Sequence, residues 1–246
     1  MSFARAIAVE PSDEEVRVRG AFDADLTVCG VTLHADCGGV LYWPEERMLI
    51  VADLHFEKGS SFAARKRMLL PPYDTMATLA ALSQVIARYA PRTVVALGDS
   101  FHDGDGPERL SQADASALRT LVERHDWIWI AGNHDPILPA MLGGQTVVGE
   151  FRLDALVMRH QAEPDAIGEV SGHYHPKSHI DVRGRRLSGA CFIHDERRIV
   201  LPAFGAYTGG LHIESEPIRA LFPAAFRIDL VLRGQLMRRE YPIAAA

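Results

Sequence analysis

The sequence predicts an α/β protein in which two packed β-sheets are flanked by helices. The first observation is an alternation of short apolar runs and helix-like segments between residues 40 and 131. The second is a change to short strand-like runs and turns over the rest of the chain. Alternating strands and helices build one sheet, and a strand-rich half supplies another. Because the 246 residues contain no repeat and no linker, we expect a single domain spanning 1–246.

The first predicted elements are a hairpin and a helix. The runs GVLYWP and MLIVA, joined by the polar turn at 45–47, predict two paired strands. A stretch rich in charge and proline then runs to residue 72 and predicts a loop. Apolar residues at helical spacing predict a helix over 74–89 with one apolar side. The residues on that side are Met76, Leu79, Leu82, Val85, Ile86 and Tyr89.

Two buried strands and a second helix follow. The apolar runs at 93–97 and 127–131 predict the strands. Between them Pro107 suits the first turn of a helix that continues through Leu118 to Val122. Further runs predict the strands of the second half, and they are ALVM, GEVSG, RLSGACFI, RIVLPA and the hairpin FRIDLVLRG.

Charge and composition narrow the function classes. The chain is 48% hydrophobic and 24% charged, as in ordinary globular proteins. Its net charge of −6 argues against a protein that coats nucleic acid without specificity. A nuclease is compatible with this charge, because bound cations and a local basic rim can face phosphates. Basic clusters at 65–67, 183–186 and 197–198 could form that rim, although such clusters are more often solvated surface turns.

Membrane and export signals are not expected in this sequence. No stretch approaches the roughly 20 apolar residues of a membrane span, and residues 1–20 lack the apolar core of a signal peptide. The three cysteines, Cys29, Cys37 and Cys191, are odd in number and lack C-x-x-C spacing. They predict buried thiols in a reducing cytoplasm, neither disulfides nor metal ligands. We therefore expect a cytoplasmic protein without a membrane partner.

Polar clusters directly follow five of the predicted strands, at the ends where α/β sheets bind ligands. These clusters consist mostly of Asp, Asn and His, and they include six of the eleven histidines. In order they are Asp53-Leu54-His55, Gly98-Asp99-Ser100-Phe101-His102-Asp103, Gly132-Asn133-His134-Asp135, Arg159-His160 and Gly172-His173-Tyr174-His175.

The residue types in these clusters suit a divalent metal ion. Imidazole nitrogens with carboxylate or amide oxygens favour Mn, Fe or Zn, and the lack of thiolates disfavours a structural zinc. In D-x-H and H-x-H, residues two apart at a strand end point to the same face, so both can reach one ion. Each motif alone has an ordinary explanation: Gly98-Asp99 or Gly132-Asn133 could be a turn, and His160 a core histidine. Their repetition at successive strand ends predicts a metal site.

The motifs D-x-H, G-D-x-x-[DH], G-N-H-[DE], a later His and G-H-x-H make residues 53–175 resemble the calcineurin-like metallophosphoesterases. The resemblance implies a four-layer α/β sandwich of two mixed sheets between helices. It also implies a phosphoesterase with two divalent ions, most simply Mn²⁺, with Fe or Zn as alternatives. The implied ligands are Asp53, His55 and His175 for one ion, Asn133, His160 and His173 for the other, and Asp99 as the bridge.

The resemblance suggests a mechanism and roles for neighbouring residues. A metal-bridging hydroxide would attack phosphorus in line, opposite the leaving oxygen. His134, which is not a ligand, would protonate that oxygen, and Asp103 or His102 would orient it. Lys58 and Arg65 follow the first motif and could bind the substrate's phosphate, but each is equally typical of a plain surface charge.

A narrower resemblance covers nearly the whole chain. The stretches ADLHFEKGSSFAARKRMLLPPYDT and LPAFGAYTGG are similar to the bacterial DNA-ligase-associated metallophosphoesterases. That family implies a phosphodiesterase or endonuclease of a DNA-damage response, encoded beside an ATP-dependent DNA ligase and a helicase. Within the second stretch Phe204 and Tyr207 could stack a base, with core packing as the favoured alternative. Residues 56–74 differ from the corresponding loop of the lipid A precursor pyrophosphatases, which weighs against that role.

Three functions therefore stay open. The first is a metal-dependent phosphodiesterase or endonuclease that acts on DNA in repair. The second is a small-molecule phosphoesterase on the same site, such as a phosphomonoesterase, a nucleotide pyrophosphatase or a cyclic-nucleotide phosphodiesterase. The third is a non-enzymatic interaction module, which the full set of ligand residues disfavours. The metal site alone does not separate the first two.

Overall fold

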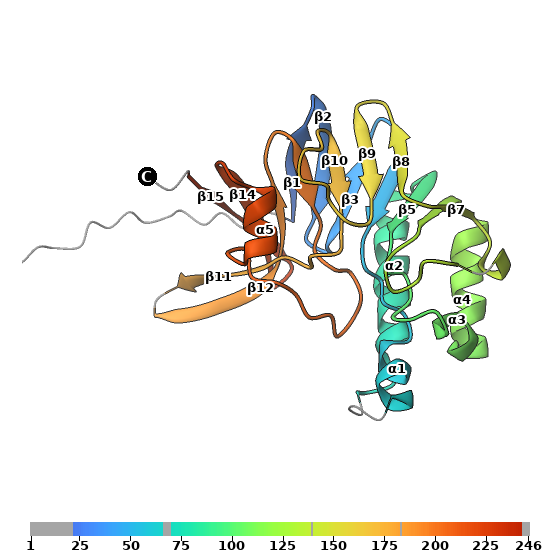
Figure 1. Ribbon diagram of the computed structural model, residues 1–246. Helices are drawn as coiled ribbons and strands as arrows, with labels where there is room; N and C mark the ends of the chain where they lie inside the picture. Colours follow the sequence, from blue (N-terminus) through green and yellow to red (C-terminus); the bar gives the residue numbers. More distant parts are fainter. Residues whose placement is uncertain (1–21, 66–69, 139, 183, 243–246) are drawn as a thin grey trace, which may run out of the picture.

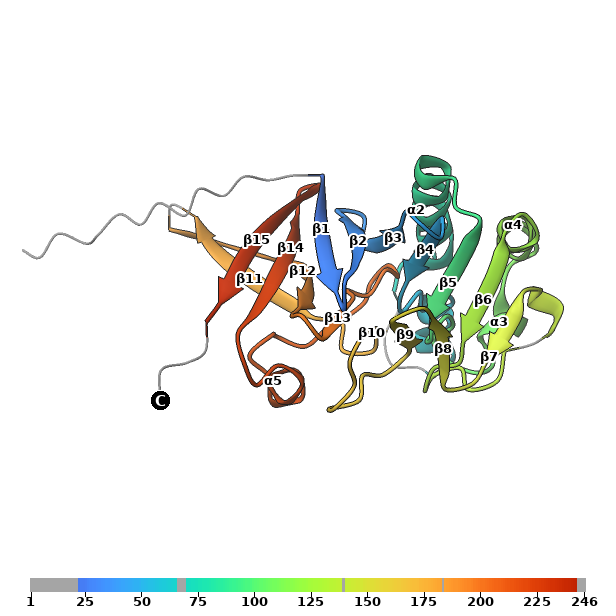
Figure 2. The ribbon, with the colours of Figure 1, turned by 90° about the horizontal axis from the view of Figure 1, so that it is seen from above.

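The computed structural model describes residues 22–65, 70–138, 140–182 and 184–242. Two mixed β-sheets form its centre (Figures 1 and 2). The strands of the first sheet, in spatial order, are β1 (Asp23–Val28), β2 (Val31–Asp36), β3 (Val40–Trp43), β4 (Met48–Val51), β5 (Thr93–Leu97), β6 (Asp126–Ile130) and β7 (Gln145–Val147).

The second sheet has the spatial order β15-β14-β12-β13-β10-β9-β8, and β11 pairs with β12 beside this path. Its strands are β8 (Glu150–Leu153), β9 (Leu156–Arg159), β10 (Glu169–Ser171), β11 (Lys177–Val182), β12 (Arg185–His194), β13 (Arg198–Val200), β14 (Phe226–Leu232) and β15 (Gln235–Tyr241). The helices are α1 (Lys58–Ala64), α2 (Asp74–Tyr89), α3 (Gly106–Arg109), α4 (Gln112–Glu123), α5 (Glu216–Leu221) and the 3₁₀ turn η1 (Ala140–Leu142).

Three apolar cores join the layers. The inner faces of the two sheets enclose one core, in which residues such as Ile50 and Val95 meet Met158 and Phe192. The outer face of the first sheet packs against α2 and α4, and the outer face of the second packs against α5 (Figure 2). The order helix, sheet, sheet, helix confirms the four-layer α/β sandwich. Its stability comes from apolar surface removed from water on both faces of each sheet.

The parallel strands decide where ligand loops lie. In the first sheet β4, β5 and β6 are parallel neighbours, and in the second β9, β10 and β13 are. Parallel strands place all their carboxyl ends at one edge of a sheet. The segment after β13 then links the two sheets at that edge, because Leu201 N donates to Ser171 O and Phe204 N donates to Ala52 O. The polar strand ends therefore meet at one end of the sandwich.

Several predicted elements are confirmed, including the β3–β4 hairpin, β5, β6 and the α2 helix. Other expectations were wrong. The stretch expected to be a loop contains α1, and the single helix expected from Pro107 onward is two, α3 and α4. The break lies at Leu110, whose ψ of 132° is extended, and Ser111 then caps α4 by accepting a hydrogen bond from Asp114 N.

Three single residues also differ from expectation. Met76 is 56% exposed, because it lies at the edge of the apolar side of α2. Cys29 is exposed at a turn, whereas Cys191 is buried as expected. Arg198 was expected in a solvated cluster, but it is fully buried, with Glu169 as its ion-pair partner and carbonyl oxygens accepting from its guanidinium. In the described parts of the chain, every helix is too short or too polar to cross a lipid bilayer.

Candidate metal centre

The loops after β4, β5, β6, β9 and β10 meet at one end of the two sheets, because hydrogen bonds join them to one another. Backbone hydrogen bonds join neighbouring loops, from Asp53 N to Gly98 O and from Gly172 N to His160 O. A further bond crosses between the sheets, since His173 N donates to Asp53 Oδ2 at 2.9 Å. Residues separated by more than a hundred positions in the sequence are thereby held in contact.

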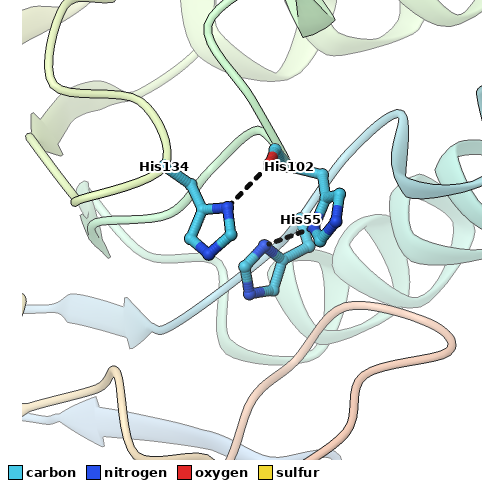
Figure 3. Close-up of side chains that lie close together, drawn as sticks. All are labelled: His55, His102 and His134. Carbon is cyan, nitrogen blue, oxygen red and sulfur yellow. Dashed lines mark hydrogen bonds between the residues drawn. The ribbon is translucent and has the colours of Figure 1, made fainter. Parts of the chain in front are cut away.

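Three sets of side chains at this end could each hold a metal ion, because the donor atoms of each set lie within 4.8 Å of one another. They are the first donor group (Asp53, His55 and His175), the second donor group (Asp99, His160 and His173) and the histidine group (His55, His102 and His134; Figure 3). Asn133 lies beside the second donor group, with its Oδ1 atom 2.9 Å from His160 Nε2. The structure thus brings together all seven residues expected as ligands.

The first donor group contains a buried carboxylate that lacks a partner. Asp53 is fully buried, and its Oδ1 atom makes no hydrogen bond to any described residue. His175 Nε2 lies 3.2 Å from that oxygen, and His55 Nε2 lies 3.3 Å from His175 Nε2. An unpaired buried carboxylate oxygen is costly unless a cation compensates it. These donors therefore fit a divalent ion.

The second donor group converges on His160. Its Nε2 atom lies 3.3 Å from Asp99 Oδ1 and 3.1 Å from His173 Nδ1. The other ring nitrogen, Nδ1, lies 2.9 Å from the backbone carbonyl oxygen of Leu97 and donates to it. This bond leaves Nε2 as the nitrogen that faces the group, which is the tautomer a metal-binding histidine needs.

The backbone of these residues is unusual. Positive φ angles of 45–70° occur at Asp53, His55, Asp99, His173 and His175. The expectation that D-x-H and H-x-H side chains share a face through strand pleating was wrong in its reason, since these residues lie beyond their strands in left-handed conformations. Such conformations cost about 1–3 kcal/mol each for a residue other than glycine and concentrate at functional sites.

The ionisable residues of the two donor groups differ strongly in their pKa values. Burial lowers the pKa of His160, but the hydrogen bond and charge of Asp99 more than offset this and raise it to about 8. Burial raises the pKa of Asp99, yet His160 and the His134 backbone bring it down to about 2. Burial and the nearby His175 lower the pKa of His55 to about 2. Of these three residues, His160 is thus the one whose side chain is protonated and positively charged at neutral pH.

The histidine group shares His55 with the first donor group and adds His102 and His134 beside it (Figure 3). His134 Nδ1 lies 2.7 Å from the carbonyl oxygen of His102, and His102 Nδ1 lies 3.4 Å from His55 Nδ1. His134 Nε2 lies 3.9 Å from Asp99 Oδ2. The side chain of His134 is 39% exposed, so it borders the centre and remains open to a substrate.

Asp103 does not orient His134. Its carboxylate accepts from Arg109 Nη2 at 2.6 Å and from Arg65 Nη2 at 3.3 Å. Of the two expected orienting residues, His102 holds the ring through its backbone carbonyl. The role of Asp103 is to join the loop after β5 to α1 and α3, since Arg109 also donates to Ser60 on α1.

The residues expected to bind substrate lie around the centre at different depths. Lys58 is half-buried at the start of α1, and its charge acts on both His55 and His102. Arg65 is exposed and paired with Asp103. Tyr207 is 45% exposed on the loop after β13, whereas Phe204 packs against the core beside α2, as the alternative held. The other two basic residues of the 65–67 cluster, and position 183, lie outside the described residues.

The sequence analysis assigned no role to Asp135. Asp135 is buried and accepts hydrogen bonds from Phe101 N at 2.9 Å and Gly132 N at 3.1 Å, which ties the second and third motifs together. Its position as the acidic fourth residue of G-N-H-[DE] was the available signal. Gly98 has a φ of 77°, and a Cβ there would lie 2.4 Å from His160 Nδ1. Only glycine lets His160 approach this closely.

Comparisons with known proteins agree with this geometry. A family model described as calcineurin-like phosphoesterase matches residues 46–234. The structure is similar to that of nuclease MPE of Pseudomonas putida, with 29% identity and a TM-score of 0.69, over 88% of this chain and 100% of that chain. It is also similar to Yfce, a phosphoesterase from E. coli, with 14% identity and a TM-score of 0.41, over 80% of this chain and 99% of that chain. No curated protein matches the chain.

The family match covers well over half of the chain and includes every residue of the three metal-binding sets. It agrees with the motifs, the four-layer fold and the donor groups described above. The chain therefore belongs to the calcineurin-like phosphoesterase family, whose members are metal-dependent hydrolases of phosphate esters.

Proposed function

We propose that the protein is a two-metal phosphodiesterase that cleaves DNA. One observation carries the proposal beyond the family level: the similarity to nuclease MPE extends over 88% of this chain at 29% identity. The donor geometry supports the two-metal part of the proposal, because the two donor groups are in contact: His173 N donates to Asp53 Oδ2, and His160 Nδ1 lies 3.9 Å from Asp53 Oδ1.

The proposed metal ligands follow the donor groups. Asp53, His55 and His175 would hold one divalent ion. Asn133, His160 and His173 would hold the other, and Asp99 would contact both. Manganese is the proposed ion, because nitrogen and oxygen donors without thiolates suit it. When bound, the two ions supply Lewis-acid chemistry, which lowers the pKa of a water and withdraws charge from the phosphoryl group.

His134 is the proposed general acid. Its Nδ1 donates to the carbonyl of His102, so the proton that reaches the leaving oxygen comes from Nε2. His102 lies against His55 and has a pKa lowered to about 4 by burial and the nearby charge of Lys58, so it is neutral at physiological pH. A neutral His102 places no positive charge against the ring of His134, which it meets with centroids 5.1 Å apart. Asp103 keeps Arg65 and Arg109 in place at the rim.

Lys58, Arg65 and Tyr207 are the proposed substrate contacts. Lys58 is half-buried, and its pKa is lowered by burial and by the charge of Lys177, so two ammonium groups face the same region. A polyanionic strand is attracted to such a pair. A role in DNA repair beside a DNA ligase and a helicase is proposed from the resemblance of the stretches 52–75 and 201–210 alone.

A substrate panel with Mn²⁺ tests the proposal. It compares bis-nitrophenyl phosphate, mono-nitrophenyl phosphate, a cyclic nucleotide, and single- and double-stranded DNA. We expect cleavage of the diester above the monoester, together with cuts in DNA, and no activity in an Asp99→Asn protein prepared in parallel. Robust monoesterase or cyclic-nucleotide activity without DNA cleavage under any metal would instead assign a small-molecule phosphoesterase.

A further inference from the structure

A groove of about 450 Å³ opens beside the second donor group. His173 forms one wall, so the groove begins at the proposed metal centre. The other walls come from the loop after β9, the segment before α5 and α5 itself. The residues that matter are His173, Tyr174, Ala162, Leu211, Ala220 and Leu221.

His134 does not line the groove, and it borders the second donor group at Asp99, whereas the groove opens at His173. Asp99 Oδ1 accepts from His134 N and lies 3.3 Å from His160 Nε2, and the His160 ring meets the His173 ring edge-on. A substrate whose leaving group is at His134 therefore extends its other substituent towards His173.

The lining is apolar and uncharged. Tyr174 is 8% exposed and meets His173 edge-on, with ring centroids 5.0 Å apart and an interplanar angle of 87°. Leu211 is 39% exposed, which is high for a leucine. Among the described residues that line the groove, none is Asp, Glu, Lys or Arg, and Gln161 offers an amide at its edge. A second phosphate would find no cation there, whereas a flat aromatic group with hydrogen-bonding edges would fit.

We propose that this groove holds a nucleoside. This nucleoside is the ester substituent that stays attached to the phosphate after cleavage. Hydrolysis breaks the P–O bond to the leaving group and forms a P–O bond to the oxygen of water. The leaving oxygen takes a proton from His134, the attacking water loses one to solvent, and His134 regains a proton from solvent after cleavage. The other substituent stays on the product, so a product nucleotide is the ligand of the groove. The inference rests on the proposed phosphodiesterase function and adds a nucleotide preference to it.

Two esters with the same leaving group test the preference. One carries thymidine and nitrophenol on the phosphate, as its 5′ or its 3′ isomer, and the other carries methyl and nitrophenol. Ala220→Trp fills the groove from an exposed position of α5, and Leu211→Ala removes an apolar wall. Glu216→Trp places the same bulk on the same helix outside the groove. All proteins are measured with saturating Mn²⁺.

We expect Ala220→Trp to lower the ratio of kcat/KM for the better thymidine ester to that for the methyl ester by at least about tenfold. Leu211→Ala should lower it by less, and Glu216→Trp should leave it unchanged. A ratio in Ala220→Trp equal to that of the wild type for both thymidine isomers overturns the groove assignment, as does an equal fall in Glu216→Trp.

Ligand binding measured by calorimetry tests the groove independently of catalysis, and so independently of the proposed function. Metal-loaded wild type should bind a thymidine monophosphate at least about tenfold more tightly than methyl phosphate, and Ala220→Trp should remove that difference. If the wild type hydrolyses neither ester, the phosphodiesterase assignment fails and the binding difference alone decides the groove. Equal affinity of the wild type for both phosphates then overturns it.

Discussion

The Nδ1 atom of His134 lies 2.7 Å from the backbone carbonyl oxygen of His102. A carbonyl oxygen only accepts, so this ring nitrogen is the donor, and Nε2 is the atom presented to a substrate. The contact joins the loop after β5 to the loop after β6. It uses the side chain of His134 and only the backbone of His102. The first prediction follows from this orientation.

Replacing His134 should affect substrates unequally. Nitrophenolate leaves without a proton, whereas a sugar hydroxyl needs one, and a general acid contributes about 10²–10⁴-fold in rate. His134→Asn should therefore keep most activity on bis-nitrophenyl phosphate and lose most DNA cleavage, with bound metal unchanged. Steady-state rates on both substrates and metal analysis check this. His34→Gln, at a half-exposed histidine of β2, is the matched control. Equal losses on both substrates, or lost metal, would make His134 a ligand.

Metal content should be two divalent ions per chain, and binding should stabilise the fold. The reasons are the two donor groups, each of which could hold an ion, and the buried Asp53 Oδ1, which has no partner among the described residues. An ion present at about 100 times its dissociation constant adds about 2.7 kcal/mol to the free energy of unfolding. Thermal unfolding of metal-free protein titrated with Mn²⁺ measures the gain, and elemental analysis measures the stoichiometry. A single ion at saturation with full activity would contradict the two-ion site.

Asp99→Asn should damage the centre more than any other ligand change. Asp99 Oδ1 accepts from His134 N at 2.9 Å and lies 3.3 Å from His160 Nε2, and an amide preserves this shape. The loss of charge leaves two proposed cations without their shared carboxylate. We expect the rate to fall by more than the about 10–100-fold typical of an outer-shell partner. Asp126→Asn, in an exposed pair with Arg92, should change neither rate nor metal content.

Metal binding should release protons near neutral pH. The pKa of His160 is raised to about 8 in the metal-free protein, so its imidazole is largely protonated at neutral pH and must lose that proton to bind a metal. His55 has a pKa lowered to about 2 and releases none. Calorimetry in buffers of different ionisation enthalpy should show about one proton released near neutral pH. The release should vanish well above the pKa of His160, and metal affinity should weaken as pH falls.

If no proton is released near neutral pH, His160 is neutral before the metal arrives. His125→Gln serves as the control, because this histidine lies near the start of β6, away from the centre, and should leave the release unchanged.

Asp135→Ala should destabilise the fold. The buried carboxylate accepts from Phe101 N and Gly132 N, and both donors would lose their partner. Leaving buried donors unsatisfied costs about 1–3 kcal/mol each. Denaturant unfolding should show a loss of about 2–4 kcal/mol for Asp135→Ala, less for Asp135→Asn, and under about 0.5 kcal/mol for Asp126→Ala. A small loss in Asp135→Ala would mean that water replaces the carboxylate.

Local patterns in the sequence were sufficient for much of the fold. The period of apolar residues specifies α2 and the central strands, because burying one face of a helix or both faces of a strand dominates their stability. The polar strand ends likewise specify the candidate site, since parallel strands carry their carboxyl ends to one edge whatever the loops do. For this reason all seven expected ligands meet in the structure.

Other features depended on contacts between distant segments. The short helices α1, α3 and α5 have too few turns for a clear apolar period, and their packing partners lie elsewhere in the chain. The left-handed backbone at Asp53 and His55 is held by hydrogen bonds to the loop after β5, in which Asp53 N donates to Gly98 O and His55 N donates to Asp99 O. No local sequence pattern predicts this strained backbone, because contacts with distant segments offset its energetic cost.

The sequence by itself determined which residues could bind metal and which strands carry them. Only the tertiary structure decided that the His102 carbonyl accepts from His134, that Asp103 pairs with two arginines, and that α5 forms a groove beside His173. The physical reason is the distance along the chain over which each kind of interaction acts. Periodicity and turn chemistry act over a few neighbouring residues, whereas hydrogen-bond partners and cavities are set by the packing of whole layers.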